Sequence, residues 1–277
     1  MISVLVLTLN EEENLPRCLE SVRWSDDVVV FDSFSTDRTV ELARAAGARV
    51  YQRAFGGYGA QREAARTEVA YKHPWVLAVD ADEEPDAELV AEVQQVARAR
   101  GGPAAYRMRR KDHFQGRWIR HSTLYPSWFV RLYRPDRVRY DGRGVHEYPV
   151  VDGPLGELRG HLLHHSFRKG LGDWMRKHVR YAELEAAENL KALSAGGIPW
   201  HEALHWWDPV HRRRFLKDLS CRLPCRPSLR FLYMYLIRGG FLDGRPGLTY
   251  CRLLSFYEYL ITLEMKDARR RGKGLPV

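Results

Sequence analysis

Two aspartates end the most apolar stretch of the first hundred or so residues. Asp80 and Asp82 directly follow residues 75–79, which form a continuous hydrophobic run typical of a buried strand. Side chains two apart on a strand point the same way, and ligands of open α/β sheets bind at the carboxyl ends of strands. A pair of carboxylates there suits a hard divalent cation whose other positions are filled by phosphate oxygens. Residues 82–85 also resemble a helix start, where acidic side chains are favoured.

Polar side chains end two further predicted strands. Thr8, Asn10 and Glu11 lie at the end of residues 3–9, and Asp32 directly follows the apolar residues 28–31. Stretches with helical spacing of apolar residues separate these strands. Strands that alternate with helices form parallel sheets with right-handed crossovers. We therefore expect all these polar groups at one edge of one sheet.

The overall charge indicates an anionic partner. The chain has 277 residues and a formal net charge of +9, which favours phosphate groups, anionic lipid or nucleic acid. No nucleic-acid-binding module is recognisable, and the acidic strand ends argue against nucleic acid. The four cysteines fit no zinc or redox spacing, which indicates a reducing compartment. No apolar run approaches the length of a spanning helix, so we expect a cytoplasmic protein or one attached to a membrane from that side.

The character of the chain changes twice. Residues 101–103 are Gly-Gly-Pro, and the stretch that follows is rich in arginine, histidine and aromatic residues with strand-like runs. Beyond residue 167 the pattern is helical. We expect a first domain over residues 1–165, with halves at 1–105 and 106–165, and a helical extension over 166–277.

Three ordered elements carry a family resemblance. Residues 8–12 read Thr-Leu-Asn-Glu-Glu, residues 32–37 read Asp-Ser-Phe-Ser-Thr-Asp, and residues 80–83 read Asp-Ala-Asp-Glu. Together they resemble glycosyltransferase family 2, the inverting nucleotide-sugar enzymes of GT-A fold. The resemblance implies an α/β GT-A domain with a Rossmann-like, mostly parallel central sheet and flanking helices. In that domain residues 1–105 would be the nucleotide-sugar-binding half and residues 106–165 the acceptor half. Phe34 departs from the family, which often has glycine there.

The resemblance implies donor-binding roles for matching residues. Asp32 would hydrogen-bond the base or ribose of a UDP-sugar, with Thr8, Asn10 and Glu11 nearby. Arg62 would neutralise the nucleotide, although an exposed helix arginine is an equal alternative.

A divalent cation is implied as well. Asp82 would ligate Mg²⁺ or Mn²⁺ bridging the diphosphate, and Asp80 would face the ribose or the metal. His164 is placed to complete the metal shell. A structural histidine is the alternative.

The catalytic base is expected in the second half. Inversion needs a base that deprotonates the acceptor hydroxyl, and a carboxylate is the usual choice. Glu147 fits that location, and the pair His146-Glu147 resembles the branch that builds the bacterial lipopolysaccharide core. The alternatives are that His146 is the base, or that Glu147 pairs with Arg143 or Arg131.

The C-terminal segment combines arginines with apolar and aromatic residues. Residues 230–241 and the helical stripe of Leu253, Phe256, Tyr257, Leu260, Ile261 and Met265 both fit interfacial helices on an anionic leaflet. An ordinary helical subdomain is the alternative.

The resemblance, together with the charge and the C-terminal composition, implies an inverting, metal-dependent enzyme at the cytoplasmic face of the inner membrane. It would move glucose from UDP-glucose to a lipid-linked glycan such as the lipopolysaccharide inner core. Another lipid-linked or polysaccharide acceptor, or a non-catalytic lipid- or nucleotide-binding relative, is the alternative. A sugar nucleotidyltransferase is disfavoured because residues 11–13 are all glutamate and would repel a triphosphate.

Overall fold

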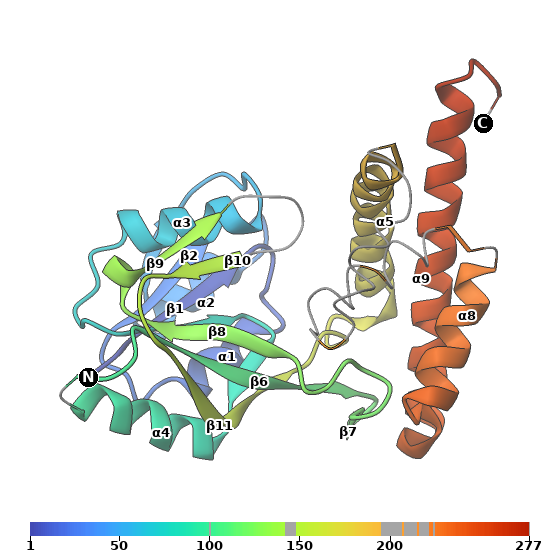
Figure 1. Ribbon diagram of the computed structural model, residues 1–277. Coiled ribbons are helices and arrows are strands. Elements are labelled where there is room, and N and C mark those ends of the chain that lie inside the picture. The colour runs from blue at the N-terminus through green and yellow to red at the C-terminus, as the bar shows by residue number, and fades with distance from the viewer. Residues whose placement is uncertain are drawn as a thin grey trace. The chain divides into compact units, whose positions relative to one another are not determined.

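The computed structural model describes residues 1–99, 101–141, 148–194, 207, 215, 222–223 and 225–276. The chain forms two compact units, Met1–Leu171 and Gly172–Val277, which are described separately below (Figure 1). The sequence-based expectation places the division six residues earlier, after residue 165.

The first unit begins with a parallel sheet. Its strands pair in the order β3-β2-β1-β4. The strands are β1 (Ser3–Thr8), β2 (Val28–Asp32), β3 (Arg49–Gln52) and β4 (Val76–Asp80), and the intervening helices are α1 (Leu15–Ser21), α2 (Thr39–Ala45) and α3 (Tyr58–Glu68). This is the alternation of strands and helices that the sequence predicts.

The same sheet continues as a mixed sheet. Strand β8 (Trp128–Tyr133) lies antiparallel between β4 and β6 (Ala105–Phe114). Strand β11 (Leu155–His164) runs parallel to β6 and antiparallel to β5 (Glu83–Pro85). The predicted α/β architecture is confirmed, with the antiparallel β8 joining a parallel half to a mixed half.

The remaining elements of this unit flank the sheet. They are α4 (Ala87–Arg98), β7 (Arg117–Trp118), a 3₁₀ turn (Pro135–Arg137), β9 (Val138–Asp141) and β10 (Tyr148–Val151). Strands β9 and β10 form a separate antiparallel pair beside α3 (Figure 1).

Both faces of the sheet are buried by these elements. On one face, apolar side chains of α1, α2 and α4 pack on β1 and β4, and on the other face Ala64 and Ala65 of α3 and Val138 and Tyr140 of β9 do so. Burial of apolar area on both faces is the dominant stabilising contribution of such a sheet.

Residues 80–85, called the acidic turn below, do not start a helix. Residues Glu83–Pro85 form strand β5, which pairs with β11, and α4 begins only at Ala87. The N-cap is Asp86, whose side chain accepts a hydrogen bond of 2.9 Å from the backbone N–H of Leu89. Because β5 pairs with β11, the turn that holds Asp82 is attached to the second half of the sheet.

The second unit is helical. It contains most of α5 (Gly170–Ser194), then α8 (Arg226–Leu232), a π-helical turn η2 (Tyr233–Ile237), a 3₁₀ turn η3 (Gly240–Asp243) and α9 (Gly244–Arg271). Ala182 and Ala186 of α5 pack on Ile261 and Met265 of α9. Among the described residues, no helix combines the length and apolar character needed to cross a membrane.

Candidate active site

Asp80 ends β4 between two buried arginines. Arg62 of α3 donates to its Oδ1 at 2.7 Å, and Arg131 of β8 donates to its Oδ2 at 2.6 Å. The arginine side chains are 2% and 7% exposed. Burial tends to raise the pKa of Asp80, but Arg131 and Arg62 outweigh it and hold that pKa well below its usual range. Asp80 therefore remains charged, and one arginine from α3 and one from β8 neutralise that charge.

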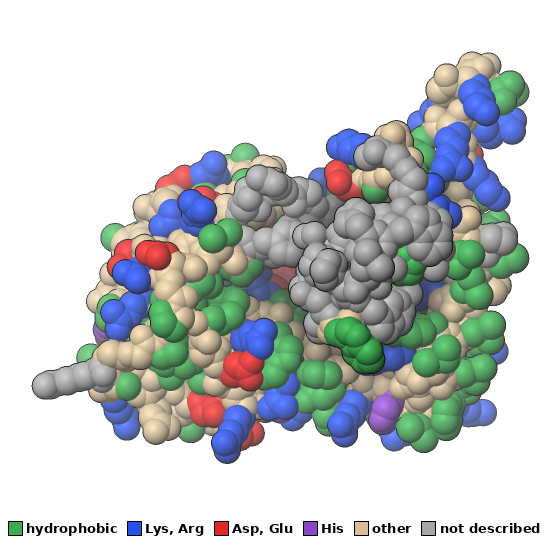
Figure 2. Space-filling view, in the orientation of Figure 1, with side chains coloured by type: hydrophobic (Ala, Val, Ile, Leu, Met, Phe, Trp, Pro, Cys, Tyr) green, Lys and Arg blue, Asp and Glu red, His purple; other side chains and the backbone are tan. Residues whose placement is uncertain are grey.

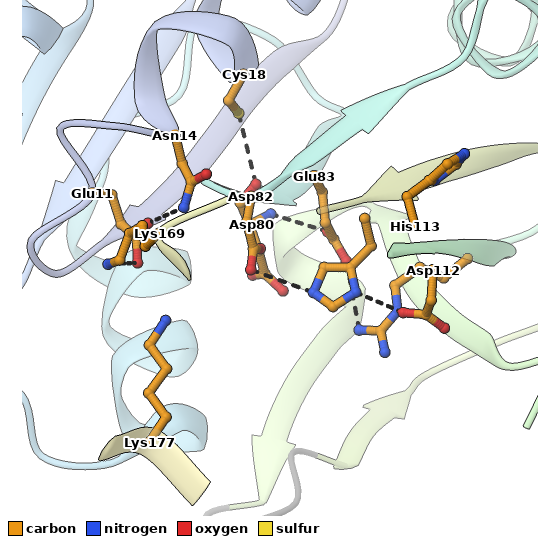
Figure 3. A network of polar contacts seen from close by, with 12 residues as sticks. Glu11, Asn14, Cys18, Asp80, Asp82, Glu83, Asp112, His113, Lys169 and Lys177 are labelled. Atoms are coloured by element: carbon orange, nitrogen blue, oxygen red, sulfur yellow. Dashed lines mark hydrogen bonds and ion pairs between the residues drawn. The ribbon is translucent and has the colours of Figure 1, made fainter. Parts of the chain in front are cut away.

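Asp82 faces a histidine from β11. Its Oδ2 lies 3.3 Å from Nε2 of His164, and its backbone carbonyl accepts a hydrogen bond of 2.9 Å from the N–H of His165. On the other side of the ring, Nδ1 of His164 lies 2.6 Å from Oδ1 of Asp112. Figure 3 shows Asp80, Asp82, Glu83 and Asp112 gathered in this network.

Charge in the network sets the protonation of its members. Burial and Arg110 lower the pKa of His164, but Asp82 and Asp112 outweigh them and raise it to about 9. Burial, followed by the charge of Asp80, raises the pKa of Glu83. Glu83 is fully buried and accepts a hydrogen bond of 3.1 Å from the N–H of Asp80, so it fixes the backbone of the acidic turn.

These residues fit a divalent cation only in part. No group of three or more His, Cys, Asp or Glu side chains in the described part of the chain is arranged to hold a metal. Asp80 faces the arginines, whereas Asp82 and His164 face each other. One carboxylate oxygen and one imidazole nitrogen suit a cation whose other positions are filled by diphosphate oxygens and water. The residues therefore fit the predicted metal through Asp82 and His164, with Asp80 in a different role.

Asp32 organises the loop after β2. It is fully buried, and its carboxylate accepts hydrogen bonds from Thr8 Oγ1 at 2.8 Å, Gln52 Nε2 at 3.1 Å and the N–H of Ser35 at 2.9 Å. The next turn residue, Phe34, has φ = 59° and is 55% exposed. Phe34 thus adopts a left-handed backbone, which glycine adopts without strain and a phenylalanine does not.

Glu11 is held by residues from both ends of the unit. Its carboxylate accepts from Asn14 Nδ2 at 2.7 Å and from Lys169 Nζ at 3.0 Å. Lys169 also donates to the carbonyl of Asn10 at 2.6 Å, and Arg168 donates to Glu84 at 2.8 Å. The loop after β1 and the acidic turn are therefore both tied to residues 168–169.

The structure groups most of the predicted residues, and the other two lie outside the described part of the chain. Asp80, Asp82, His164 and Arg62 meet at the strand ends, and the pairs Thr8–Asp32 and Asn10–Glu11 form the neighbouring loops. His146 and Glu147 lie outside the described residues; β9 and β10 flank them in the sequence.

Three residues of the site were not assigned to it from the sequence. Arg131 had a usable signal, because it is the one charged residue in the run Trp-Phe-Val-Arg-Leu-Tyr, and a buried arginine needs a carboxylate partner. Asp112 and Lys169 stand among other charged residues, so nothing local distinguishes them.

The sheet has a parallel half with helices between its strands and an antiparallel strand that crosses to the second half. The acidic turn lies at the edge that the two halves share. This arrangement is that of a glycosyltransferase of GT-A fold. Comparison with known proteins agrees. The family model for glycosyl transferase family 2 matches residues 3–150, and the chain belongs to that family. It is an enzyme of the glycosyltransferase class.

Individual relatives extend the similarity to the whole chain. The chain is 28% identical to a lipopolysaccharide core biosynthesis glycosyltransferase, LpsC, of Rhizobium meliloti, over 92% of this chain and 90% of the relative. It is 38% identical to an uncharacterized glycosyltransferase of Rickettsia typhi, over 99% and 89%. A solved mannosyltransferase of Pyrobaculum calidifontis, in complex with GDP-Man and Mn²⁺, shares the fold with a TM-score of 0.50, 13% identity and coverage of 95% and 86%.

Proposed function

We propose that this enzyme is an inverting, metal-dependent transferase that moves glucose from UDP-glucose to a lipid-linked envelope glycan such as the lipopolysaccharide inner core. The observation that carries the proposal is the Asp82–His164 pair beside the arginine-bound Asp80. Similarity to a lipopolysaccharide core enzyme over nine-tenths of both chains supports the acceptor class.

The residues at the strand ends would bind the nucleotide-sugar donor. Asp82 and His164 would hold Mg²⁺ or Mn²⁺, which when bound neutralises charge that develops on the departing diphosphate. Arg62 and Arg131 keep Asp80 charged without an uncompensated buried anion. The loops organised by Asp32 and Glu11 would border the nucleoside.

The donor and its metal requirement can be tested by thermal shift. Ligands that bind only the folded protein raise its apparent stability by mass action. We expect UDP and UDP-glucose to raise the unfolding temperature in the presence of Mn²⁺ and to have little effect in EDTA. GDP and CDP with their sugars are the matched controls. A response to GDP-sugars alone would refute the UDP assignment, and no response to any nucleotide would refute donor binding.

We assign to Glu147 the role of the general base that removes the proton from the acceptor hydroxyl. Replacing Glu147 by Gln removes the basic carboxylate while keeping the side-chain size, so UDP binding should persist. Transfer should fall by about 10²–10⁴-fold, which is the usual contribution of a general base. His146→Gln is the matched control. Near-normal transfer by Glu147→Gln with loss in His146→Gln would move the base to His146.

Of the two segments that the sequence suggested for membrane contact, residues 230–241 are the better supported. Ile261 and Met265 of the α9 stripe are buried against α5, although Phe256 of the same stripe is exposed. Exposed apolar side chains are frequent on α8, η2 and η3; they include Leu229, Leu232, Tyr233, Leu236, Ile237, Phe241 and Leu242. Residues 222–242 include four arginines and no acidic residue. Hydrophobic and basic side chains also appear together over the second unit in Figure 2.

This composition supports peripheral attachment to an anionic leaflet. Apolar side chains inserted at the headgroup level, with arginines beside them, bind anionic bilayers through both area burial and charge. Co-sedimentation with phosphatidylglycerol vesicles should fall at least several-fold in Ile237→Asp, which replaces a side chain that is 77% exposed. Leu124→Asp, an exposed leucine of the first unit, is the control. Equal binding by both variants would refute this surface as the membrane contact.

A further inference from the structure

Asp112 and His164 are cross-strand partners. Strands β6 and β11 run parallel, and their register places His164 directly beside Asp112. The two side chains are each 14% exposed, and Oδ1 of Asp112 lies 2.6 Å from Nδ1 of His164. The contact is therefore a short, nearly buried hydrogen bond whose position is set by the sheet.

The two sides of the His164 ring have different surroundings. Asp112 is itself fixed by Arg110, whose Nε lies 3.1 Å from Asp112 Oδ1. The opposite ring nitrogen, Nε2, lies 3.3 Å from Oδ2 of Asp82 in the acidic turn. The hydrogen bond between the N–H of His165 and the carbonyl of Asp82 holds that turn against β11.

We propose that Asp112 is a positioning residue that orients His164 for binding a divalent cation together with Asp82. The inference rests on the metal dependence proposed above. A histidine that ligates a metal usually donates its other ring N–H to a carboxylate, which fixes the tautomer and the ring orientation. Here the hydrogen bond to Asp112 places the proton on Nδ1 and leaves the lone pair of Nε2 directed toward Asp82 when the ring is neutral.

A second histidine of β11 provides a control. Nδ1 of His161 lies 3.4 Å from Oδ2 of Asp86, and its Nε2 lies 3.1 Å from the hydroxyl of Tyr125. Nε2 of His161 therefore faces a tyrosine, whereas Nε2 of His164 faces Asp82. A variant of Asp86 disturbs a histidine–carboxylate contact without touching the Asp82 side.

The test measures Mn²⁺ binding to the full-length protein in the presence of UDP by electron paramagnetic resonance. Asp112→Asn should weaken Mn²⁺ affinity about 10- to 100-fold, the usual effect of removing such a partner. Pulsed measurements should show coupling of Mn²⁺ to an imidazole nitrogen in the wild type. That coupling should be lost in His164→Ala and reduced in Asp112→Asn. Asp86→Asn, which preserves the capping oxygen of α4, should behave like the wild type.

A double variant separates positioning from general destabilisation. If Asp112 acts through His164, adding Asp112→Asn to His164→Ala should not change Mn²⁺ affinity further. Asp112→Ser gives the same test if the asparagine variant fails to fold. If a folded Asp112 variant binds Mn²⁺ with wild-type affinity and full nitrogen coupling, the role of Asp112 is refuted while the proposed metal dependence stands. Absence of Mn²⁺ binding by the wild type overturns the proposed metal dependence and the inference with it.

Discussion

The two aspartates of the acidic turn should fail in different ways when they are replaced. Asp80→Asn removes the charge that Arg62 and Arg131 share, and both arginines are nearly fully buried. Asp82→Asn removes the charge of a side chain that is 21% exposed and lies 3.3 Å from His164. We expect the first change to act on stability and the second on cation binding.

The size of the stability effect follows from burial. Breaking a buried ion pair by removing one partner costs about 3–5 kcal/mol, because the remaining charge is left unpaired. Asp80 is 31% exposed, so water can partly replace it, which favours the lower end, about 3 kcal/mol. That loss corresponds to a fall of roughly 6–12 °C in unfolding temperature. Asp82→Asn should cost no more than about 1 kcal/mol, as for partly exposed ion pairs.

Urea unfolding in EDTA, followed by Mn²⁺ titration of the folded variants with UDP, separates the two effects. Asp80→Asn should lower the unfolding midpoint with an unchanged slope, whereas Asp82→Asn should keep the midpoint and lose metal-dependent UDP binding. A double-mutant cycle with Arg131→Met should give a coupling of about 0.5–3 kcal/mol with Asp80→Asn. A wild-type midpoint for Asp80→Asn would refute the role of Asp80 as the charge partner of the arginines.

Three further changes test other parts of the structure. Gly160→Ala would place a Cβ 2.3 Å from the backbone nitrogen of Leu89 and should cost about 1–3 kcal/mol. Gly156→Ala would meet side chains, the ring of Tyr106 at 2.5 Å and Cγ of Pro103 at 3.1 Å, so it should cost less, and an equal loss in thermal unfolding would contradict this account. Burial opposes the charge of Asp27, but hydrogen bonds from Ser3, the Lys72 N–H and Arg49 lower its pKa, so the stability it contributes above about pH 4 is lost as the pH falls; acid unfolding of Asp27→Asn should show a flatter decline. Burial lowers the pKa of His178, so protonation below about pH 6.5 should destabilise the helical unit; His178→Gln should remove that part of the pH dependence in urea unfolding.

Local sequence pattern predicted the first half of the sheet well. Strands β1, β2 and β4 contain continuous apolar runs separated by helical spacing, and the structure places the polar residues that end them at one edge. The short strand β3 reads Arg-Val-Tyr-Gln and was predicted from its position between two helical stretches. Asp82 and His164, which lie 82 residues apart in the chain, were both assigned to the metal from the family resemblance, and the structure brings them within 3.3 Å.

Features that depend on strand order were not predictable in this way. The position of β8 between β4 and β6 is a tertiary choice, so the partnership of Arg131 with Asp80 is invisible in either segment. The pairing of Asp112 with His164 similarly depends on the register between β6 and β11. Amphipathic spacing in α9 could not tell a membrane-facing stripe from a buried one, because both need the same periodicity.

The contacts of residues 168 and 169 determine where this enzyme can be divided. Arg168 binds Glu84 and Lys169 binds Glu11, so the last residues before the helical unit brace both the acidic turn and the loop after β1. A fragment that stops at residue 165 would therefore keep every strand of the sheet and still lose two of its supports. Hybrid enzymes that combine this catalytic unit with the helical unit of a relative should be joined after Leu171. Exchange at that junction would leave the contacts of Arg168 with Glu84 and of Lys169 with Glu11 intact.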